Sequence, residues 1–192
     1  MEELSEDTTA WRRELRRAMV ERRTALDGAG HAGLSARIAG HALAALPRPA
    51  VAAFCWPIKH EPDVRAIVTT WAAEGARAAL PVVVAEDAPL LFREWTPETP
   101  LTADRYGIPA PAAGAWLTPD LILLPLNGFD GAGYRLGYGG GYFDRTLAAL
   151  VPRPLAVGVG FEINRIASIQ PAPHDQRLDW IVTENGAFRP AA

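Results

Sequence analysis

The chain has one cysteine and no long apolar run. Because Cys55 stands alone, an internal disulfide framework and a cysteine-based zinc site are excluded. Its apolar setting, VAAFCW, predicts a buried strand residue. No apolar run reaches the roughly 18 residues that a membrane-spanning helix needs, and the acidic opening MEELSEDTTA is unlike a signal peptide. We therefore expect a cytoplasmic protein without a membrane partner.

The sequence also lacks a strong excess of either charge. Its formal net charge is -3, so a general attraction to nucleic acid is not expected. Positive charge is concentrated near the N-terminus, in WRRELRRAMVERR. That cluster fits either a local anion site or the solvated face of a helix. With 49% apolar residues, a disordered chain is excluded and a globular one is expected.

Apolar patterning predicts helices that alternate with short, continuously apolar strands. Helices are expected over residues 9–26, 34–46, 63–74 and 142–150, with a glycine-rich break, GAGHAG, between the first two. Strands are expected over residues 50–56, 78–84, 90–94, 120–125, 155–161 and 179–183. This alternation is typical of a parallel sheet covered on both faces. We expect one α/β domain over residues 1–192, a three-layer α/β/α arrangement with a mostly parallel, Rossmann-like sheet.

Two segments stand out from this pattern. Residues 96–119 form a proline- and glycine-rich stretch too long for a simple connection, and such loops are often functional. The second is RLGYGGGYFDR, residues 135–145, which follows the strand DLILLP and opens a helix. A glycine loop at the carboxyl end of a parallel strand is suited to phosphate, because backbone N–H groups and the helix N-terminus face the anion.

The side chains around the glycine loop fit the same chemistry. Arg135 can supply a bidentate fork for phosphate oxygens, and Asp144 can hold a magnesium ion. The loop is neither a Walker A loop, since no Gly-Lys-Ser/Thr follows, nor a dinucleotide fingerprint. The alternative is a glycine-rich turn with a solvent-facing aspartate.

The segment LLPLNGFDGAGYRLGYGGGYFDR resembles the signature of the 5-formyltetrahydrofolate cyclo-ligases, also called methenyltetrahydrofolate synthetases. Four further segments match that family in the right order: the N-terminal pattern of Arg12, Leu15 and Arg16, then WPIKHEPD, RYGIPAP and PHDQRLDWIVTE. The resemblance covers nearly the whole chain. It implies a three-layer α/β fold and an ATP-dependent ring closure of a reduced folate.

In the implied reaction, the formyl oxygen of 5-formyltetrahydrofolate attacks the γ-phosphate of Mg-ATP. N10 of the folate then attacks the phosphorylated carbon, and loss of phosphate leaves 5,10-methenyltetrahydrofolate. Such chemistry needs positioning and charge neutralisation more than a protein nucleophile. The implied ligands are ATP, Mg²⁺ and a small-molecule folate, with no nucleic acid, in a monomer or weak homo-oligomer.

The resemblance also implies roles for single residues. Asp144 and Asp175 would be the magnesium ligands, and Arg135 and Tyr142 would act in catalysis. Substrate contacts would come from three residues: Trp56, Glu61 and Tyr106. The nucleotide would be bound by Arg12, Leu15, Arg16, Arg135, Leu136, Gly137, Tyr138, Gly139, Gly140, Gly141, Tyr142 and Phe143.

Some positions depart from the family pattern. Arg12 replaces a lysine, and Val64 lacks the hydroxyl of the usual threonine. Asn164 stands where many members have glutamine, and Phe143 replaces a tyrosine. These departures leave open a nucleotide-binding paralogue that acts on another, even non-folate, substrate. A non-catalytic nucleotide-binding module also stays open; it would be favoured if Asp144 and Asp175 lay far apart.

Overall fold

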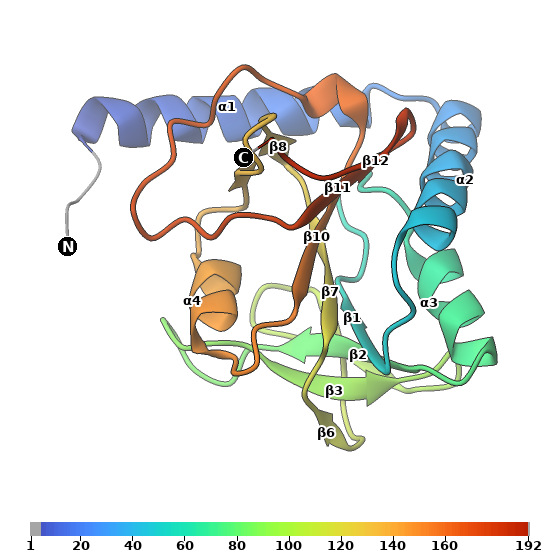
Figure 1. The fold of residues 1–192 in the computed structure, drawn as a ribbon. Helices are drawn as coiled ribbons and strands as arrows, with labels where there is room; N and C mark the ends of the chain where they lie inside the picture. Colours follow the sequence, from blue (N-terminus) through green and yellow to red (C-terminus); the bar gives the residue numbers. More distant parts are fainter. Residues whose placement is uncertain (1–4, 192) are drawn as a thin grey trace.

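The computed structural model describes residues 5–191, and its centre is an eight-stranded sheet (Figure 1). Five neighbouring strands pair in parallel, and an antiparallel strand or pair extends each edge. The strand order across the sheet is β12 (Gly186–Phe188), β11 (Trp180–Thr183), β10 (Leu155–Val159), β7 (Leu121–Pro125), β1 (Val51–Phe54), β2 (Arg77–Val82), β3 (Leu91–Trp95) and β6 (Trp116–Leu117).

Helices cover both faces of this sheet. Helices α2 (Gly28–Ala45) and α3 (Arg65–Ala73) pack on one face, and α4 (Tyr142–Ala149) packs on the other. The mostly parallel three-layer α/β/α fold expected from the sequence is therefore confirmed. Helix α1 (Glu6–Thr24) instead runs across one end of the molecule, against the segments that follow β7 and β10 (Figure 1).

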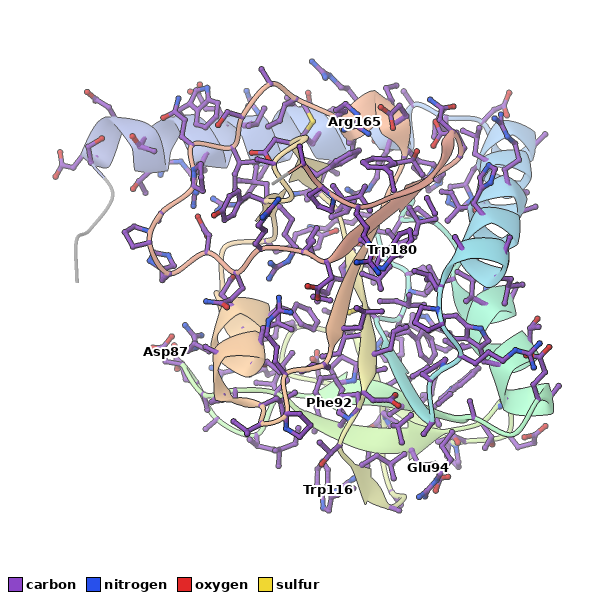
Figure 2. The ribbon with its side chains drawn as sticks, in the orientation of Figure 1. Asp87, Phe92, Glu94, Trp116, Arg165 and Trp180 are labelled. Atoms are coloured by element: carbon purple, nitrogen blue, oxygen red, sulfur yellow. The ribbon has the colours of Figure 1, made fainter. Side chains whose placement is uncertain are left out.

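The central strand β7 shows why these segments form a buried sheet. Its side chains alternate between the two cores: Leu123 faces α2 and α3, while Ile122 and Leu124 face α4. Each fully buried side chain of this size contributes about 1.5–3 kcal/mol. At the far edge, Phe92 of β3 is buried while Trp116 of β6 is half exposed (Figure 2). Strand β7 is thus apolar on both of its faces, as is required of a parallel sheet that is covered on both sides.

Helix α2 differs most from the sequence prediction, since it begins at Gly28 rather than at residue 34. The predicted break, GAGHAG, forms its first six residues. The carboxylate of Asp27 accepts a hydrogen bond of 2.6 Å from the backbone N–H of Gly30, which caps a helix that glycine alone would weaken. Capping and packing thus outweigh the low helix propensity of glycine.

The proline- and glycine-rich stretch is more regular than expected. It contains a two-stranded ribbon of β4 (Leu101–Ala103) and β5 (Pro109–Pro111), followed by β6, which joins the sheet edge. A second ribbon, β8 (Gly128–Phe129) with β9 (Arg135–Leu136), lies between β7 and α4. The start of the predicted glycine loop is therefore a short strand.

Cys55 is not a buried strand residue, as the sequence suggested. It follows the last residue of β1 and is partly exposed. Within residues 5–191, no helix combines the length and the apolar composition that crossing a membrane demands.

Candidate functional site

The strand order reverses direction at β1, which has β2 on one side and β7 on the other. In doubly wound sheets, ligands bind at the carboxyl ends of the strands beside such a switch point. A cavity of about 10 Å³, close to the room that one water needs, lies there. It is lined by Cys55, Pro57, Glu61, Pro62, Val64, Leu123, Leu124, Pro125 and Val159.

Glu61 is the charged group of this cavity and is only 4% exposed. One carboxylate oxygen, Oε2, accepts a hydrogen bond from the N–H of Ile58 at 3.0 Å, and Oε1 accepts one from the hydroxyl of Tyr138 at 2.7 Å. Burial raises the pKa of Glu61, opposed by these two bonds and by the positive charges of Arg23 and Lys59. Glu61 is thus a buried acceptor held by defined partners.

The glycine loop contacts this carboxylate through Tyr138. Gly139 and Gly141 adopt φ values of 98° and 64°, in the left-handed region that other residues avoid. The carbonyl of Gly137 accepts a hydrogen bond of 2.9 Å from Nε of Arg16. Between these glycines, Tyr138 points to Glu61. The predicted phosphate loop and the predicted substrate carboxylate therefore meet.

Helix α1 supplies a row of side chains that face this site. Arg12, Arg16, Met19 and Arg23 lie at the i, i+4, i+7 and i+11 positions of one helical face. Arg12, Met19 and Arg23 are buried, and Arg16 is half-buried. Burial, reinforced by the nearby charge of Arg12, lowers the pKa of Arg16. The basic N-terminal cluster is thus partly an inward-facing row rather than a solvated face.

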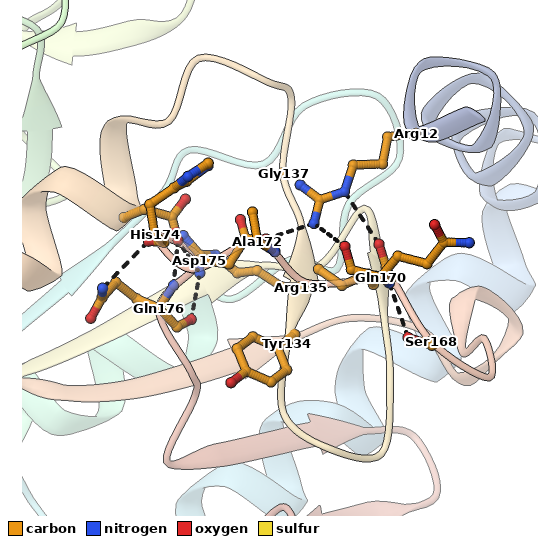
Figure 3. A network of polar contacts seen from close by, with 12 residues as sticks. Arg12, Tyr134, Arg135, Gly137, Ser168, Gln170, Ala172, His174, Asp175 and Gln176 are labelled. Carbon is orange, nitrogen blue, oxygen red and sulfur yellow. Dashed lines mark hydrogen bonds and ion pairs between the residues drawn. The ribbon is translucent and has the colours of Figure 1, made fainter. Parts of the chain in front are cut away.

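Arg12 and Asp175 form one half of a polar network (Figure 3). Nη2 of Arg12 lies 2.6 Å from Oδ2 of Asp175 and 2.9 Å from the carbonyl of Gln170. The same Oδ2 accepts a hydrogen bond from the N–H of Ala172 at 2.6 Å. These contacts attach α1 to the segment before β11.

Arg135 and Asp144 form the other half. Nη1 of Arg135 lies 3.2 Å from Oδ1 of Asp144 and donates to the carbonyl of Gln176 at 3.2 Å. The N–H of Gln176 donates to the same Oδ1 at 2.9 Å. Since Gln176 follows Asp175 in the chain, the two predicted metal ligands belong to neighbouring segments. Arg135 is buried and paired, rather than free at the mouth of the loop.

The carboxylates of Asp144 and Asp175 are ligands of the type that magnesium takes, but two carboxylates do not fill its coordination shell. Magnesium usually takes one or two carboxylates, several waters and the phosphate oxygens of its substrate. Among residues 5–191, no cluster of three or more His, Cys, Asp or Glu side chains is placed to hold a metal ion. Both aspartates carry the carboxylate oxygens that magnesium takes as ligands, and both are ion-paired in this structure, Asp144 with Arg135 and Asp175 with Arg12.

The predicted aromatic contacts lie apart from the cavity lining. Trp56 packs edge-to-face on Trp95 and beneath the guanidinium of Arg65. The hydroxyls of Tyr106 and Tyr142 are 2.7 Å apart, so they join the turn between β4 and β5 to the first residue of α4. The structure brings Tyr106 and Tyr142 together with each other, not with Glu61.

The remaining predicted nucleotide contacts divide by exposure. Leu136 is buried, and Leu15 and Phe143 are partly buried. Gly140 is exposed at the tip of the loop. The side chain of Leu136 thus packs in the interior, whereas Gly140 lies at the surface.

Sequence reasoning missed Arg23 and Asn127. Arg23 is 1% exposed and donates 2.7 Å hydrogen bonds to the carbonyl of Lys59 and to Oδ1 of Asn127. The spacing of Arg12, Arg16 and Arg23 on one helical face was the available signal. For Asn127 there was none, because only tertiary packing places it beside Arg23.

The chain matches a protein-family model over residues 8–184, that of the 5-formyltetrahydrofolate cyclo-ligase family. A 5-formyltetrahydrofolate cyclo-ligase of Mycolicibacterium smegmatis is 31% identical over 137 residues, which cover 66% of this chain and 70% of that protein. A 5-formyltetrahydrofolate cyclo-ligase from Escherichia coli K12 is 36% identical over 93 residues, which cover 45% of this chain and 51% of that protein.

Solved structures give the same result for the fold. The NMR structure of Aquifex aeolicus 5,10-methenyltetrahydrofolate synthetase superposes with a TM-score of 0.79 at 28% identity, covering 94% of this chain and 93% of that one. A 5,10-methenyltetrahydrofolate synthetase from Mycoplasma pneumoniae superposes with a TM-score of 0.74 at 24% identity, covering 90% of this chain and 98% of that one. With the family model matched over most of its length, the chain belongs to the 5-formyltetrahydrofolate cyclo-ligase family.

Proposed function

We propose that this protein is a ligase that converts 5-formyltetrahydrofolate to 5,10-methenyltetrahydrofolate, with consumption of Mg-ATP and release of ADP and phosphate. The proposal is supported by family membership. The structural observation that carries it is the 2.7 Å hydrogen bond from Tyr138, in the glycine loop, to Glu61, in the switch-point cavity. A nucleotide on that loop and a folate at that carboxylate would be neighbours.

The reaction proceeds in two steps. The formyl oxygen attacks the γ-phosphorus, and the bond from that phosphorus to the bridging oxygen of ADP breaks. N10 then attacks the activated formyl carbon and gives up its proton, while the bond from carbon to oxygen breaks and phosphate leaves. Phosphorylation solves the leaving-group problem of an amide oxygen, so the protein needs to supply positioning and charge.

The residues of the site are suited to positioning the two substrates and to neutralising the charge of the phosphates. Backbone N–H groups of the glycine loop and the N-terminus of α4 bind phosphate oxygens, and Arg16 supplies a positive charge against Gly137. Asp144 and Asp175 would hold magnesium, which supplies charge neutralisation at the phosphates when bound. Glu61, as an acceptor, would bind the amino and ring N–H donors of the pterin.

A second candidate is a paralogue with an altered substrate. Val64, which lacks the hydroxyl of the usual threonine, lines the same cavity as Glu61. A non-catalytic module is less well supported, because Asp144 bonds to the residue next to Asp175. A nucleic-acid-binding helix is disfavoured, because Arg12 and Arg23 of α1 are buried.

Purified protein with 5-formyltetrahydrofolate and Mg-ATP tests the proposal. We expect the absorbance of the methenyl product to appear together with one ADP per turnover. The matched control omits either substrate. ATP binding without product would favour the altered-substrate paralogue and reject cyclo-ligase activity.

A further inference from the structure

Arg23 is the most completely buried charged side chain beside the proposed folate carboxylate, and it has no role in the proposed reaction. It lies in the last turn of α1, and its guanidinium contacts three separate segments. Nε donates to the carbonyl of Lys59 at 2.7 Å, Nη1 to Oδ1 of Asn127 at 2.7 Å, and Nη2 to the hydroxyl of Tyr138 at 2.6 Å. The planar fork of arginine suits such a three-way contact, which lysine could not make.

Arg23 acts on Glu61 in two ways, by an ion pair and through Tyr138. Nη2 of Arg23 lies 3.9 Å from Oε1 of Glu61, with both side chains nearly inaccessible to solvent. The same Nη2 donates to the hydroxyl of Tyr138, which fills a lone pair of that oxygen and leaves its proton to donate to Oε1. Arg23 therefore acts on the carboxylate directly by charge and indirectly by orienting Tyr138.

The contact with Lys59 holds the turn that carries Glu61. Lys59 and His60, just before it, have φ values of 47° and 57°, in the left-handed region that costs ordinary residues energy. Arg23 binds the carbonyl of Lys59, and Nε2 of His31 lies 2.9 Å from the carbonyl of Glu61. The turn is thus held from α1 and α2 in a conformation that its own residues do not favour.

We propose that Arg23 is a positioning residue that keeps Glu61 ionised and aimed into the switch-point cavity, and that it couples this carboxylate to the glycine loop through Tyr138. The functional part of this inference rests on the proposed folate reaction. An ionised Glu61 offers only acceptors, which the N–H donors of a pterin require. A protonated Glu61 would present a competing donor.

The proposal can be tested with Arg23→Met, which keeps an unbranched side chain but removes the charge, and Arg23→Lys, which keeps the charge but not the fork. Arg22→Met, on the exposed side of the same turn, is the matched control. The first readout is the pH titration of Glu61 in the ligand-free protein, which is measured from the NMR signal of its carboxyl carbon. The other ionisable groups around Glu61 are His31, Cys55, Lys59 and Tyr138. The ring signals of His31 and Tyr138 are recorded in the same titration, so that their ionisation is distinguished from that of Glu61.

In Arg23→Met we expect Glu61 to titrate at a higher pH than in the wild type, and Arg23→Lys to restore most of the difference. The second readout is kinetic. The KM for 5-formyltetrahydrofolate should rise by about tenfold in Arg23→Met, since a charged hydrogen-bond donor that positions the carboxylate is lost, with less change in the KM for ATP. Arg22→Met should match the wild type in both.

A folded Arg23→Met protein in which the Glu61 titration is unchanged would overturn the proposal. If Arg23→Met does not fold, Arg23→Gln decides, because glutamine also removes the charge but keeps a side-chain N–H donor. A folded Arg23→Gln protein with an unchanged Glu61 titration would then reject the proposal. If the titration shifts but the wild type makes no methenyl product, the cyclo-ligase proposal fails while the link from Arg23 to Glu61 stands.

Discussion

Glu61 is a carboxylate whose burial opposes the charge that its proposed role requires. Its pKa is raised by burial, and the bonds from Ile58 and Tyr138 with the charges of Arg23 and Lys59 only partly offset that rise. An active-site group is often found in such a balance. At the scale of single residues, pH therefore becomes a probe of this one group.

We expect Glu61→Gln to raise the KM for 5-formyltetrahydrofolate by about tenfold or more, since a charged hydrogen-bond acceptor is lost, and to leave the KM for ATP nearly unchanged. In the wild type, folate affinity should fall as pH drops through the raised pKa of Glu61. Steady-state kinetics between pH 5 and about 8 check both. Glu98→Gln, at an exposed position, is the control. Equal folate KM values in wild type and Glu61→Gln would remove Glu61 from substrate binding.

The same substitution makes a prediction for stability. Because the folded-state pKa of Glu61 lies above the unfolded value, its contribution to stability is fully present below the unfolded pKa and is lost as pH rises through the folded one. The free energy of unfolding of the wild type, relative to Glu61→Gln, should therefore decline over that range. Urea unfolding at several pH values measures this difference, and a rise would contradict the assignment.

At the scale of elements, the junction between the glycine loop and α4 depends on backbone conformation. Gly141 has a φ of 64°, and a Cβ there would lie 2.8 Å from Nη1 of Arg145. Gly137, in the same loop, lies outside the left-handed region, and a Cβ there would meet no atom within 4 Å. The two glycines therefore differ in what they contribute, although the sequence presents them alike.

We expect Gly141→Ala to reduce the free energy of unfolding by about 1–2 kcal/mol, since a non-glycine residue is strained in the left-handed region. Gly137→Ala should change it by no more than about 0.5 kcal/mol. Urea unfolding of both variants measures the contrast. Equal losses in the two variants would mean that the loop does not keep this backbone geometry.

Helix α3 begins beside the site and offers a second test at this scale. Val64 stands at its N-cap without a side-chain bond, and Oδ1 of Asp63 instead accepts from the N–H of Arg65 at 3.0 Å. Asp63→Ala should cost about 1 kcal/mol, whereas Asp63→Asn keeps the accepting oxygen and should cost less. The bonds from Arg65 lower the pKa of Asp63, so its stabilisation is present above the unfolded pKa and is lost as pH falls through the folded one. Thermal unfolding near neutral and acidic pH would show no gap between the two variants if the cap were unimportant.

At the scale of the whole molecule, α1 joins regions of the chain that are far apart in sequence. Arg12 contacts Asp175, Arg16 contacts Gly137, and Arg23 contacts Asn127. A ligand on the glycine loop would bind only when these regions are assembled. Ligand binding should therefore stabilise the whole fold.

Mg-ATP should raise the thermal unfolding temperature, with a gain of about 2.7 kcal/mol at a concentration 100 times Kd. Arg16→Met should reduce that gain, because the charge beside the loop is lost, and a chelator should reduce it in the wild type. Arg17→Met, at an exposed position of α1, should behave as wild type. Differential scanning fluorimetry measures these shifts; the same gain in Arg16→Met as in the wild type would place the nucleotide elsewhere.

The sequence by itself determined the layered α/β fold, because continuously apolar strands such as β7 must be covered on both faces wherever they lie. It also determined the glycine loop and, through several matching segments, the family; the single-domain organisation stays a prediction. Only the tertiary structure decided that Arg135 is buried against Asp144, that Tyr106 meets Tyr142, and that Arg23 lies beside Glu61. A local sequence pattern predicts the period of a helix or strand and its capping residue. The pairings named here depend instead on the strand order and on the path of α1 across the molecule, which bring together residues up to 163 positions apart.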